Sequence, residues 1–474
     1  MTSVPLRNLF LWFVLSSAAV LAQSRSPGVV YSKYEDVRLL LQAAGKDLPA
    51  GLKKDSCGPA LCWSQWIAEH DREVRDRLAQ GVDDSLVNLL LFGTSFTRRP
   101  RIRPGELLPP AGAQPSPQSK AAEAVLAGRL DDFVAGLAAP GANERLLFAR
   151  SFLQREGYPV RTTEERAAVK QRLLESLGRV FKEMSAYEGE LEQARAGADP
   201  TAEMALRSTL FQSRGISLDT SLQPNFALEQ SLVALQRRGL LAPGAVRKVA
   251  VIGPGLDFTD KNSGYDFYPL QTIQPFALMD SLLRRGLSRK DQLEIYSFDI
   301  SPMVNDHLAR IRRRASRGSA YVLQLPLESQ VKWDSELQRY WEGFGATIGS
   351  PAQPAAIPVG VASSVWVRAV RVASWAVLKI HSVDLNIVTQ RMQPVPGGGF
   401  DLIVATNVLV YYDVFDQCLA ELNVEQMLRP GGLLLSNNLL LELPYSNLRA
   451  AGDLAVAYSD RPADGDHIFW YQRR

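Results

Sequence analysis

A short apolar run that ends in a glycine turn constrains the fold of this chain more than any other segment. Residues 248–257 read Lys-Val-Ala-Val-Ile-Gly-Pro-Gly-Leu-Asp. An apolar run of this length is typical of a strand buried on both faces. Because Gly253 and Gly255 carry no Cβ, they permit a tight turn in which the backbone approaches a ligand closely. The segment therefore predicts a buried strand followed by a loop that binds a nucleoside-containing cofactor.

From residue 248 onward, strand and helix patterns alternate, as they do in parallel α/β sheets. The expected strands are 248–252, 293–298, 376–380 continuing to 383–385, 400–405 and 432–436. The expected helices are 270–285, 302–317 and 414–428. Segments 454–458 and 467–472 predict a hairpin at the edge of the sheet. An insertion of uncertain fold is expected near 319–375, with a strand at 321–327 and a helix at 334–344.

The first half of the chain carries a different pattern. Residues 1–22 have the basic start, apolar centre and small-residue end of a secretory signal peptide, and a buried N-terminal helix is the alternative. Residues 23–245 are expected to be mostly helical, with apolar residues at helical spacing in 63–78 and in 84–92 and a proline-rich linker near 99–119. Thr162 and Glu165 have the spacing of a capping box. We expect an exported protein, periplasmic or secreted, without a stable membrane span; it is cytoplasmic if residues 1–22 are not a functional signal.

Charge and cysteine content narrow the partners of the chain. A formal net charge of +3 over 474 residues gives no reason to expect a nucleic acid. In an exported protein, Cys57 and Cys62 would close a small disulfide loop. A metal site at these cysteines is less favoured, because no second cysteine or histidine pair lies nearby. Cys418 lies in an apolar helical pattern and is expected to be a packed core thiol.

The residues after the glycine turn bear on the identity of the cofactor. A dinucleotide fingerprint requires a third glycine, but Phe258 occupies that position. Asp257 precedes it, and a carboxylate repels phosphate groups. S-adenosylmethionine carries an ammonium, a sulfonium and an adenosine but no phosphate. We therefore expect this cofactor in preference to NAD or FAD.

Three further strand ends carry candidate ligands. Asp299 ends the second strand and either accepts the ribose hydroxyl hydrogens or caps the next helix, a role for which Ser301 competes. Asp384 either accepts the adenine amino group, with Leu385 over the ring, or is a turn residue. Asn407 ends the fourth strand, where ligands bind in open α/β sheets.

Residues 400–413 and 427–435 carry the most specific pattern. The first reads Phe-Asp-Leu-Ile-Val-Ala-Thr-Asn-Val-Leu-Val-Tyr-Tyr-Asp, and the second contains Leu-Arg-Pro-Gly-Gly. With the glycine turn, this pattern resembles class I S-adenosylmethionine-dependent methyltransferases. The Asn-Val-Leu-Val-Tyr-Tyr part is most similar to the chemotaxis-receptor (CheR-type) branch, which also has a helical N-terminal domain. The resemblance covers about 246–474 and implies a Rossmann-like, seven-stranded methyltransferase sheet.

The resemblance also implies roles for the candidate residues. The methionine and ribose end would be lined by Gly253, Gly255 and Asp257, and the ribose held by Asp299. Asp384 and Leu385 would hold the adenine, and Asn407 would lie beside the reactive methyl. The chain departs from the methyltransferase family at Val251, where an acid is common. It departs again at Asp257, which stands where the turn of this family has its third glycine.

No catalytic residue is assigned, because methyl transfer from a sulfonium is an in-line displacement that depends on alignment. Tyr411, Tyr412 and the loop from Tyr265 to Tyr268 either line the acceptor side or are packing residues. The methyl acceptor and the oligomeric state do not follow from the sequence. Since S-adenosylmethionine is made in the cytosol, the alternative function is an exported, non-catalytic binding or structural protein with the same fold.

Overall fold

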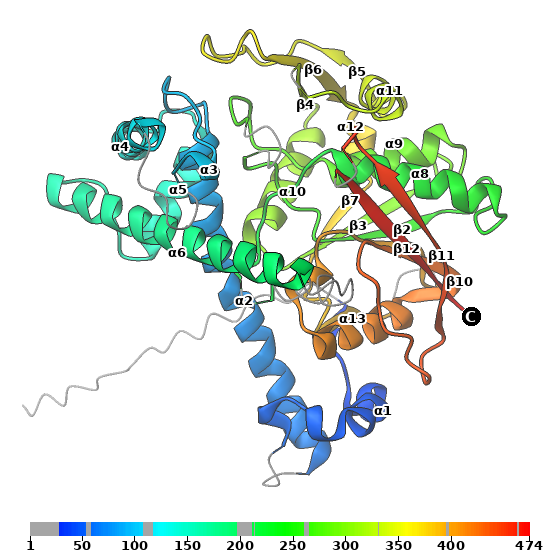
Figure 1. Cartoon of the computed structure of the whole chain (residues 1–474). Coiled ribbons are helices and arrows are strands. Elements are labelled where there is room, and N and C mark those ends of the chain that lie inside the picture. The colour runs from blue at the N-terminus through cyan, green and yellow to red at the C-terminus, as the bar shows by residue number, and fades with distance from the viewer. Residues whose placement is uncertain are drawn as a thin grey trace, which may run out of the picture.

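The structure is a computed structural model that describes residues 28–53, 58–107, 117–196, 211–212, 214–259, 265–329, 331–394, 398–461 and 464–474. Its centre is one seven-stranded sheet, and a group of helices from the first half of the chain lies beside it (Figure 1). The sheet strands are β2 (Lys248–Ile252), β3 (Glu294–Asp299), β7 (Ile380–Asp384), β9 (Phe400–Ala405), β10 (Leu428–Ser436), β11 (Leu448–Ala457) and β12 (Gly465–Arg473).

The strand order across the sheet is β11-β12-β10-β9-β2-β3-β7. The five strands from β10 to β7 pair in parallel, and β12 is antiparallel to β10 and forms a hairpin with β11. In chain order the parallel strands are arranged 3-2-1-4-5, which is the order of doubly wound α/β folds. The order reverses between β2 and β9, so the crevice at the carboxyl ends of these two strands is the expected ligand position. The α/β sheet and its edge hairpin are confirmed.

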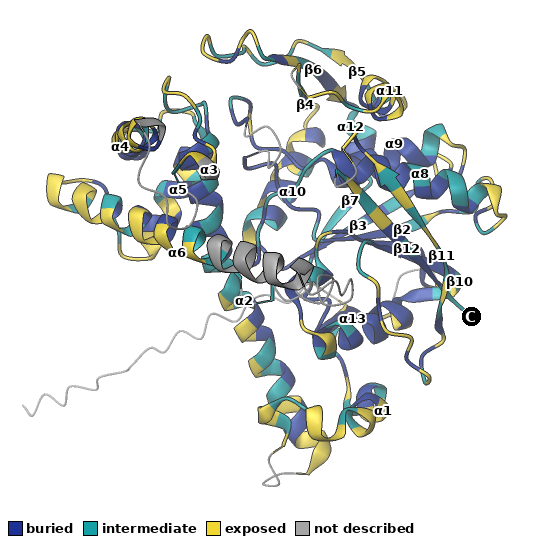
Figure 2. Ribbon diagram, in the orientation of Figure 1, coloured by how far each residue is buried: buried dark blue, intermediate teal, exposed yellow. Residues whose placement is uncertain are grey.

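Both faces of the sheet are buried, as the apolar run at 248–252 predicts. Val249 and Val251 pack on one face with residues of α8 (Gln223–Arg237), α9 (Gln274–Arg284) and α10 (Pro302–Ala315). Ala250 and Ile252 pack on the other face with α1 (Tyr34–Ala44), α13 (Val414–Met427) and the first half of α2 (Pro59–Phe92). Side chains alternate between the faces because successive strand residues point to opposite sides. Figure 2 shows the central strands as almost entirely buried.

Most of the expected elements are present, with two corrections. Residues 376–380 are not the start of a strand, because α12 (Ser374–Leu378) is a short helix and β7 begins at Ile380. The two helices expected at 63–78 and 84–92 are one continuous helix, α2. The capping box is confirmed: the Glu165 carboxylate accepts from the Thr162 N–H at 3.0 Å, and Thr162 Oγ1 accepts from the Glu165 N–H at 3.2 Å.

The first half is mostly helical, as expected, and it is joined closely to the sheet. Besides α1, α2 and α8, the helices among its described residues are α3 (Pro104–Leu107), α4 (Pro117–Ala138), α5 (Glu144–Arg155) and α6 (Thr163–Ala196), with 3-10 turns Gly45–Asp47 and Ala50–Leu52. The strand β1 (Val29–Tyr31) was not expected; it pairs with β8 (Gln390–Met392) from the second half. Of the proline-rich stretch 99–119, residues 108–116 lie outside the described residues, and helices occupy 104–107 and 117–119.

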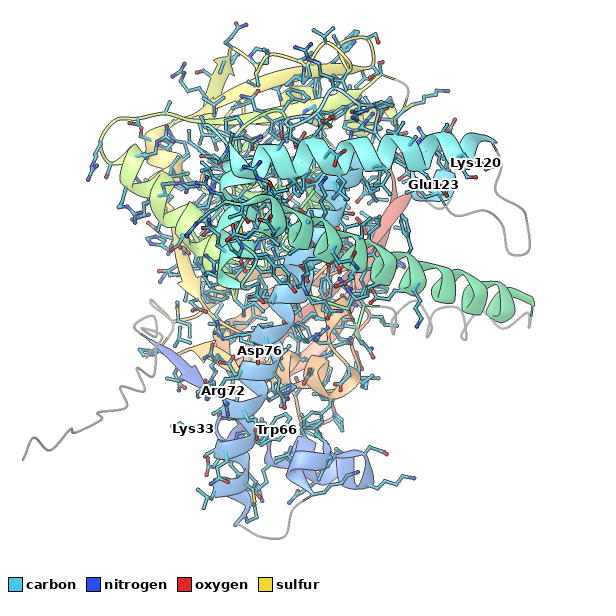
Figure 3. All side chains as sticks on the ribbon, turned by 90° about the vertical axis from the view of Figure 1, so that its left-hand side faces the viewer. Lys33, Trp66, Arg72, Asp76, Lys120 and Glu123 are labelled. Carbon is cyan, nitrogen blue, oxygen red and sulfur yellow. The ribbon has the colours of Figure 1, made fainter. Side chains whose placement is uncertain are left out.

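The long helix α2 runs along the side of the molecule from the α1 end to the group formed by α4, α5 and α6 (Figure 1). Its first half contacts α13: the Trp66 ring stacks on His70 at 4.6 Å and meets Phe415 edge-on at 5.8 Å. Figure 3 shows Trp66 on this half of α2, with Arg72 and Asp76 further along the same helix; these last two are exposed. The second half of α2 belongs to the core that also contains Val249 and Val251.

The insertion expected near 319–375 forms a small antiparallel sheet with the strand order β4-β6-β5. Its elements are β4 (Tyr321–Glu328), α11 (Ser335–Gly343), β5 (Gly349–Ala352) and β6 (Val365–Val372). It lies at one end of the molecule, away from α13 (Figure 1). The remaining short element is the 3-10 turn Leu409–Tyr411 after β9.

The structure bears on the expectations for a membrane span and for the cysteines. No helix of the described residues is both long enough and apolar enough to cross a membrane. Cys62 is disulfide-bonded, whereas Cys57, its expected partner, lies outside the described residues together with residues 1–27. The pairing of Cys57 with Cys62 and the signal peptide stay predictions. Cys418 is free and buried, as expected of a core thiol, and burial raises its pKa to about 11.

Candidate functional site

A cavity lies at the carboxyl ends of β2, β3 and β9, where the strand order of the sheet reverses. Its walls come from the ends of these strands, from the segment that follows β7, from residues 408–412, from Leu78 of α2 and from residues 216–221. About 850 Å³ of empty space lies between these walls when the open solvent at the mouth is included, and the enclosed cavity volume is about 80 Å³.

Five of the seven residues that the sequence nominates line this cavity. They are Gly253, Gly255, Asp299, Leu385 and Asn407. Residues separated by as many as 154 positions in the chain therefore meet at one place. The reason is topological, because the carboxyl ends of adjacent parallel strands share one edge of the sheet.

The two glycines of the turn are required by the backbone. Gly253 has φ +62° and Gly255 has φ +63°, a region that L-residues with a side chain rarely occupy. A Cβ on Gly253 would lie 2.5 Å from Val408 Cγ2, and one on Gly255 would lie 2.8 Å from the Leu218 carbonyl oxygen. The turn is thus pressed against two other segments of the chain, and this crowding by itself requires glycine.

Asp299 is the buried carboxylate of the site. Its Oδ1 accepts a hydrogen bond from the Ser301 N–H at 2.8 Å. Burial raises the pKa of Asp299 to about 7, although hydrogen bonds from the backbone N–H groups of Ser301 and Gly255 oppose the shift. Ser301 is the N-cap of α10 but makes no side-chain cap bond. Asp299 therefore braces the chain before α10 and the glycine turn together, while it also lines the cavity.

Asn407 has an unusual backbone. With φ +57°, it is the one non-glycine residue with a positive φ among those that the structure describes. Its N–H donates to the Asn437 amide oxygen at 2.9 Å, and its own amide oxygen accepts from Asn437 Nδ2 at 2.6 Å. Backbone strain of this kind is concentrated at functional sites. The pair of amides holds Asn407 at the cavity although its side chain is exposed.

Asp257 and Asp384, the other two nominated residues, lie outside the cavity wall. The Asp257 carboxylate is buried and accepts from the Tyr268 hydroxyl at 2.9 Å and from Gln271 Nε2 at 2.8 Å. Asp384 Oδ1 accepts from Arg75 Nη1 of α2 at 2.7 Å. Since local sequence does not reveal which way a side chain turns after a strand, these partners were missed.

The candidates for an acceptor wall separate into two groups. Tyr411 and Tyr412 line the cavity, and burial raises the pKa of Tyr412 above its ordinary value. The loop from Tyr265 to Tyr268 is not part of this wall: both tyrosines are buried in a cluster with Val361 and Val365 of the insertion. That loop therefore has the packing role, one of the two roles considered for it.

Residues 216–221 form a wall of the site that sequence reasoning missed. The segment reads Ile-Ser-Leu-Asp-Thr-Ser, and Ile216 and Leu218 are buried whereas Ser217 and Asp219 are half-buried. Thr220 N–H donates to the Leu256 carbonyl at 2.9 Å, and Leu256 N–H donates to the Leu218 carbonyl at 2.7 Å. The alternation of apolar and polar residues is a signal of an extended segment. Nothing in it shows that the segment pairs with residue 256.

The charged residues described in the cavity wall are all acidic. Among the described residues that line it, the carboxylates are Asp219 and Asp299, and none is lysine, arginine or histidine. Along this described wall a phosphate group would meet two carboxyl groups and no basic side chain. The cavity is instead suited to a ligand that carries positive charge and hydroxyl groups.

Comparison with known proteins gives only distant likenesses. No protein-family model matches the chain, and no curated protein is similar to it in sequence. Among solved structures it is similar to the N-methyltransferase NodS from Bradyrhizobium japonicum WM9 (15% identity, 52% of this chain, 94% of NodS, TM-score 0.25). It is also similar to TrmN from Thermus thermophilus (12% identity, 53% of this chain, 52% of TrmN, TM-score 0.26). A third similar structure is that of the magnesium protoporphyrin IX methyltransferase ChlM from Synechocystis PCC 6803 with bound SAM (12% identity, 52% of this chain, 79% of ChlM, TM-score 0.25). At these scores the likeness decides nothing about the ligand of this chain.

Proposed function

We propose that the chain is a class I S-adenosylmethionine-dependent methyltransferase. The observation that carries this proposal is a cavity whose described lining residues include two carboxylates and no basic side chain, located where the strand order of a doubly wound sheet reverses. S-adenosylmethionine has an ammonium and a sulfonium for these charges and ribose hydroxyls for Asp299. Dinucleotides and nucleoside triphosphates bring phosphates, for which the described part of this wall has no cation.

In this proposal each cavity residue has a physical task. Gly253 and Gly255 keep the turn narrow, and the ionised Asp299 accepts hydrogen bonds from the ribose hydroxyls. Leu385 supplies an apolar surface for the adenine. Bound S-adenosylmethionine supplies an activated methyl group, and Asn407, with Tyr411 and Tyr412, forms the wall where an acceptor would be aligned with it. Alignment is the main contribution a protein makes to such a displacement.

The CheR-type assignment and the acceptor are finer proposals. The CheR-type assignment is supported by the segment Asn407-Val408-Leu409-Val410-Tyr411-Tyr412 and by the helical first half of the chain. Apart from Asp219 and Asp299, the described residues that line the cavity include no charged group that would select one acceptor class.

Calorimetric titration of the full chain tests the proposal. We expect heat of binding with S-adenosylmethionine and S-adenosylhomocysteine, and none with ATP or NAD⁺. The Asp299→Asn variant serves as the control, because it keeps the shape of the side chain and removes its charge. Absence of binding by the wild type to either adenosyl ligand would contradict the proposal, as would tighter binding of ATP.

The second candidate is an exported, non-catalytic protein with the same fold. The observations that favour it are the signal-like pattern of residues 1–22 and the presence of Val251 where the family often has an acid. A reporter fused after residue 30 distinguishes the two settings. Export of the reporter places the chain where the cofactor is scarce and favours this candidate, whereas retention in the cytosol favours the enzyme.

A further inference from the structure

We infer that Gln274, the first residue of α9, binds the ammonium group of the cofactor's methionine part through its amide oxygen, and that Thr406 orients this amide. This inference rests on the proposed function. It assigns a ligand-binding role to a residue that belongs to none of the motifs of the sequence and lies in an ordinary helical pattern.

The two side chains form a buried pair in the cavity wall. Gln274 and Thr406 both line the cavity and are only 4% and 5% exposed. Gln274 Nε2 donates to Thr406 Oγ1 at 2.7 Å. Among the described residues, no group donates to the amide oxygen Oε1 of Gln274. This oxygen is largely shielded from water, so a hydrogen bond from a cationic donor in the cavity would be favourable.

The strand order places this pair at the opposite end of the cavity from the adenine. Neighbouring strands of the sheet are β7, β3, β2 and β9, and the cavity residues at their ends are Leu385, Asp299, the glycine turn and Thr406. A ligand with its adenine on Leu385 and its ribose at Asp299 therefore extends across the turn toward β9. In S-adenosylmethionine the sulfonium and then the amino-acid group follow the ribose. The amino-acid group is thus the part that reaches Gln274.

A neutral pair of this kind matches an amino-acid group, which carries a carboxylate beside its ammonium. The amide oxygen of Gln274 accepts from the ammonium and brings no negative charge that would repel the carboxylate. The Thr406 hydroxyl accepts from Gln274, and its hydrogen donates to none of the residues that the structure describes. That hydrogen is therefore available to the carboxylate.

Both members of the pair are held by the core of the protein. Thr406 directly follows β9, whose residues Val404 and Ala405 are fully buried. Gln274 begins α9, in which Phe276 and Met279 are fully buried. The bond between hydroxyl and amide then sets the direction of the amide. An acceptor that is already oriented loses little freedom when it binds a ligand.

Calorimetry on the full chain with three ligands tests the inference. S-adenosylmethionine and S-adenosylhomocysteine both carry the ammonium group, whereas 5′-methylthioadenosine carries neither the ammonium nor the carboxylate. Gln274→Met keeps the length of the side chain and removes the amide. We expect its affinity for the first two ligands to fall about tenfold to a hundredfold, the range for loss of a hydrogen bond to a charged group. Its affinity for methylthioadenosine should stay the same.

Thr406 provides a second, independent pair of variants. Thr406→Val removes the hydroxyl that orients Gln274, and it should weaken S-adenosylmethionine and S-adenosylhomocysteine about tenfold without weakening methylthioadenosine. Thr406→Ser keeps the hydroxyl and should retain the affinities of the wild type. Asp299→Asn, which acts at the ribose, should weaken all three ligands.

The outcomes separate the inference from the proposed function. If the wild type binds no adenosyl ligand, the proposed function fails and the inference fails with it. If the wild type binds but Gln274→Met keeps full affinity for S-adenosylmethionine, the ammonium is bound elsewhere and the inference alone is wrong. An equal loss for methylthioadenosine would likewise overturn it, because it would show a general disturbance of the cavity. Should the unfolding temperature show that Gln274→Met does not fold, the same outcomes are read from Thr406→Val against Thr406→Ser.

Discussion

Asp299 combines burial with a position in the cavity wall, and this makes ligand binding sensitive to pH. Its pKa is raised to about 7, mainly by burial. In the free protein the carboxyl is therefore protonated below pH 7 and ionised above it. Ribose hydroxyls donate to the ionised form, so a ligand that binds through them has to displace the proton at low pH.

We therefore expect the affinity for S-adenosylmethionine to be constant above about pH 8 and to fall below pH 7. The loss at pH 6 should be about tenfold relative to the plateau, as follows from a single group with this pKa. Calorimetry between pH 5.5 and 8.5 measures it. In Asp299→Asn the affinity should be lower and independent of pH in this range. A wild-type profile that matches that of the variant would contradict the assignment.

The glycine turn offers a matched pair of substitutions. Gly255 and Gly286 have nearly the same φ, +63° and +65°, but a Cβ on Gly286 would meet nothing within 4 Å. Gly286→Ala should lower the free energy of unfolding by about 1 kcal/mol, the cost of the backbone conformation alone. Gly255→Ala adds the collision with the Leu218 carbonyl and should cost about 3 kcal/mol. Urea denaturation measures both, and equal losses would show that the contact is unimportant.

At the scale of elements, the helix α2 connects the two halves of the chain through Arg75, whose side chain is 11% exposed. Arg75 Nε donates to Asp71 at 3.1 Å and Nη1 donates to Asp384 at 2.7 Å. Asp71, with a side chain only 5% exposed, also accepts from Asn386 Nδ2 and Thr389 Oγ1 after β7. The helix thereby fixes the segment that carries Leu385 at the adenine end of the cavity.

Arg75→Met should destabilise the protein by about 3 kcal/mol, because it leaves the buried Asp71 carboxylate without its cationic partner. The matched control is Arg289→Met, since Arg289 pairs with Asp291 where both side chains are about two-thirds exposed. This control should leave the unfolding midpoint unchanged. Chemical denaturation of both variants provides the comparison. Equal midpoints for the two variants would exclude a stabilising role for the Arg75 cluster.

At the scale of the whole molecule, the helical half and the sheet share their cores. One cluster of buried side chains unites Leu86 and Leu89 of α2, Phe133 of α4, and Val249 and Val251 of β2. A second unites Trp63 and Ile67 with the other face of the sheet. Removal of residues 1–245 would take away α8 from one face of the sheet and α1 and the first half of α2 from the other, at a cost that scales with the uncovered apolar area.

We therefore expect residues 246–474 alone to be insoluble or to lack a cooperative unfolding transition. The full chain should unfold in a single transition that is reported identically by far-ultraviolet circular dichroism and tryptophan fluorescence. A soluble fragment 246–474 that unfolds cooperatively would show that the sheet is an independent domain.

Several features of this protein follow from the sequence alone, because their causes are local. The apolar run at 248–252, the turn at Gly253 and Gly255, and the strand ends at Asp299 and Asn407 each depend on periodicity and turn chemistry within about ten residues. Once the strands are known to be parallel, these residues must share one edge of the sheet. The part of the cavity wall that the second half of the chain contributes was therefore predictable.

Other features were decided only by the tertiary structure. Sequence did not show that Asp219 lies beside Leu256, that Arg75 engages Asp384, or that Asp257 turns toward Tyr268 and Gln271. Each of these depends on how α2 and residues 216–221 pack against the sheet, and packing is set by contacts between segments far apart in the chain. The sequence by itself thus determined the sheet and one side of the cavity, and the tertiary structure decided which carboxylates line it.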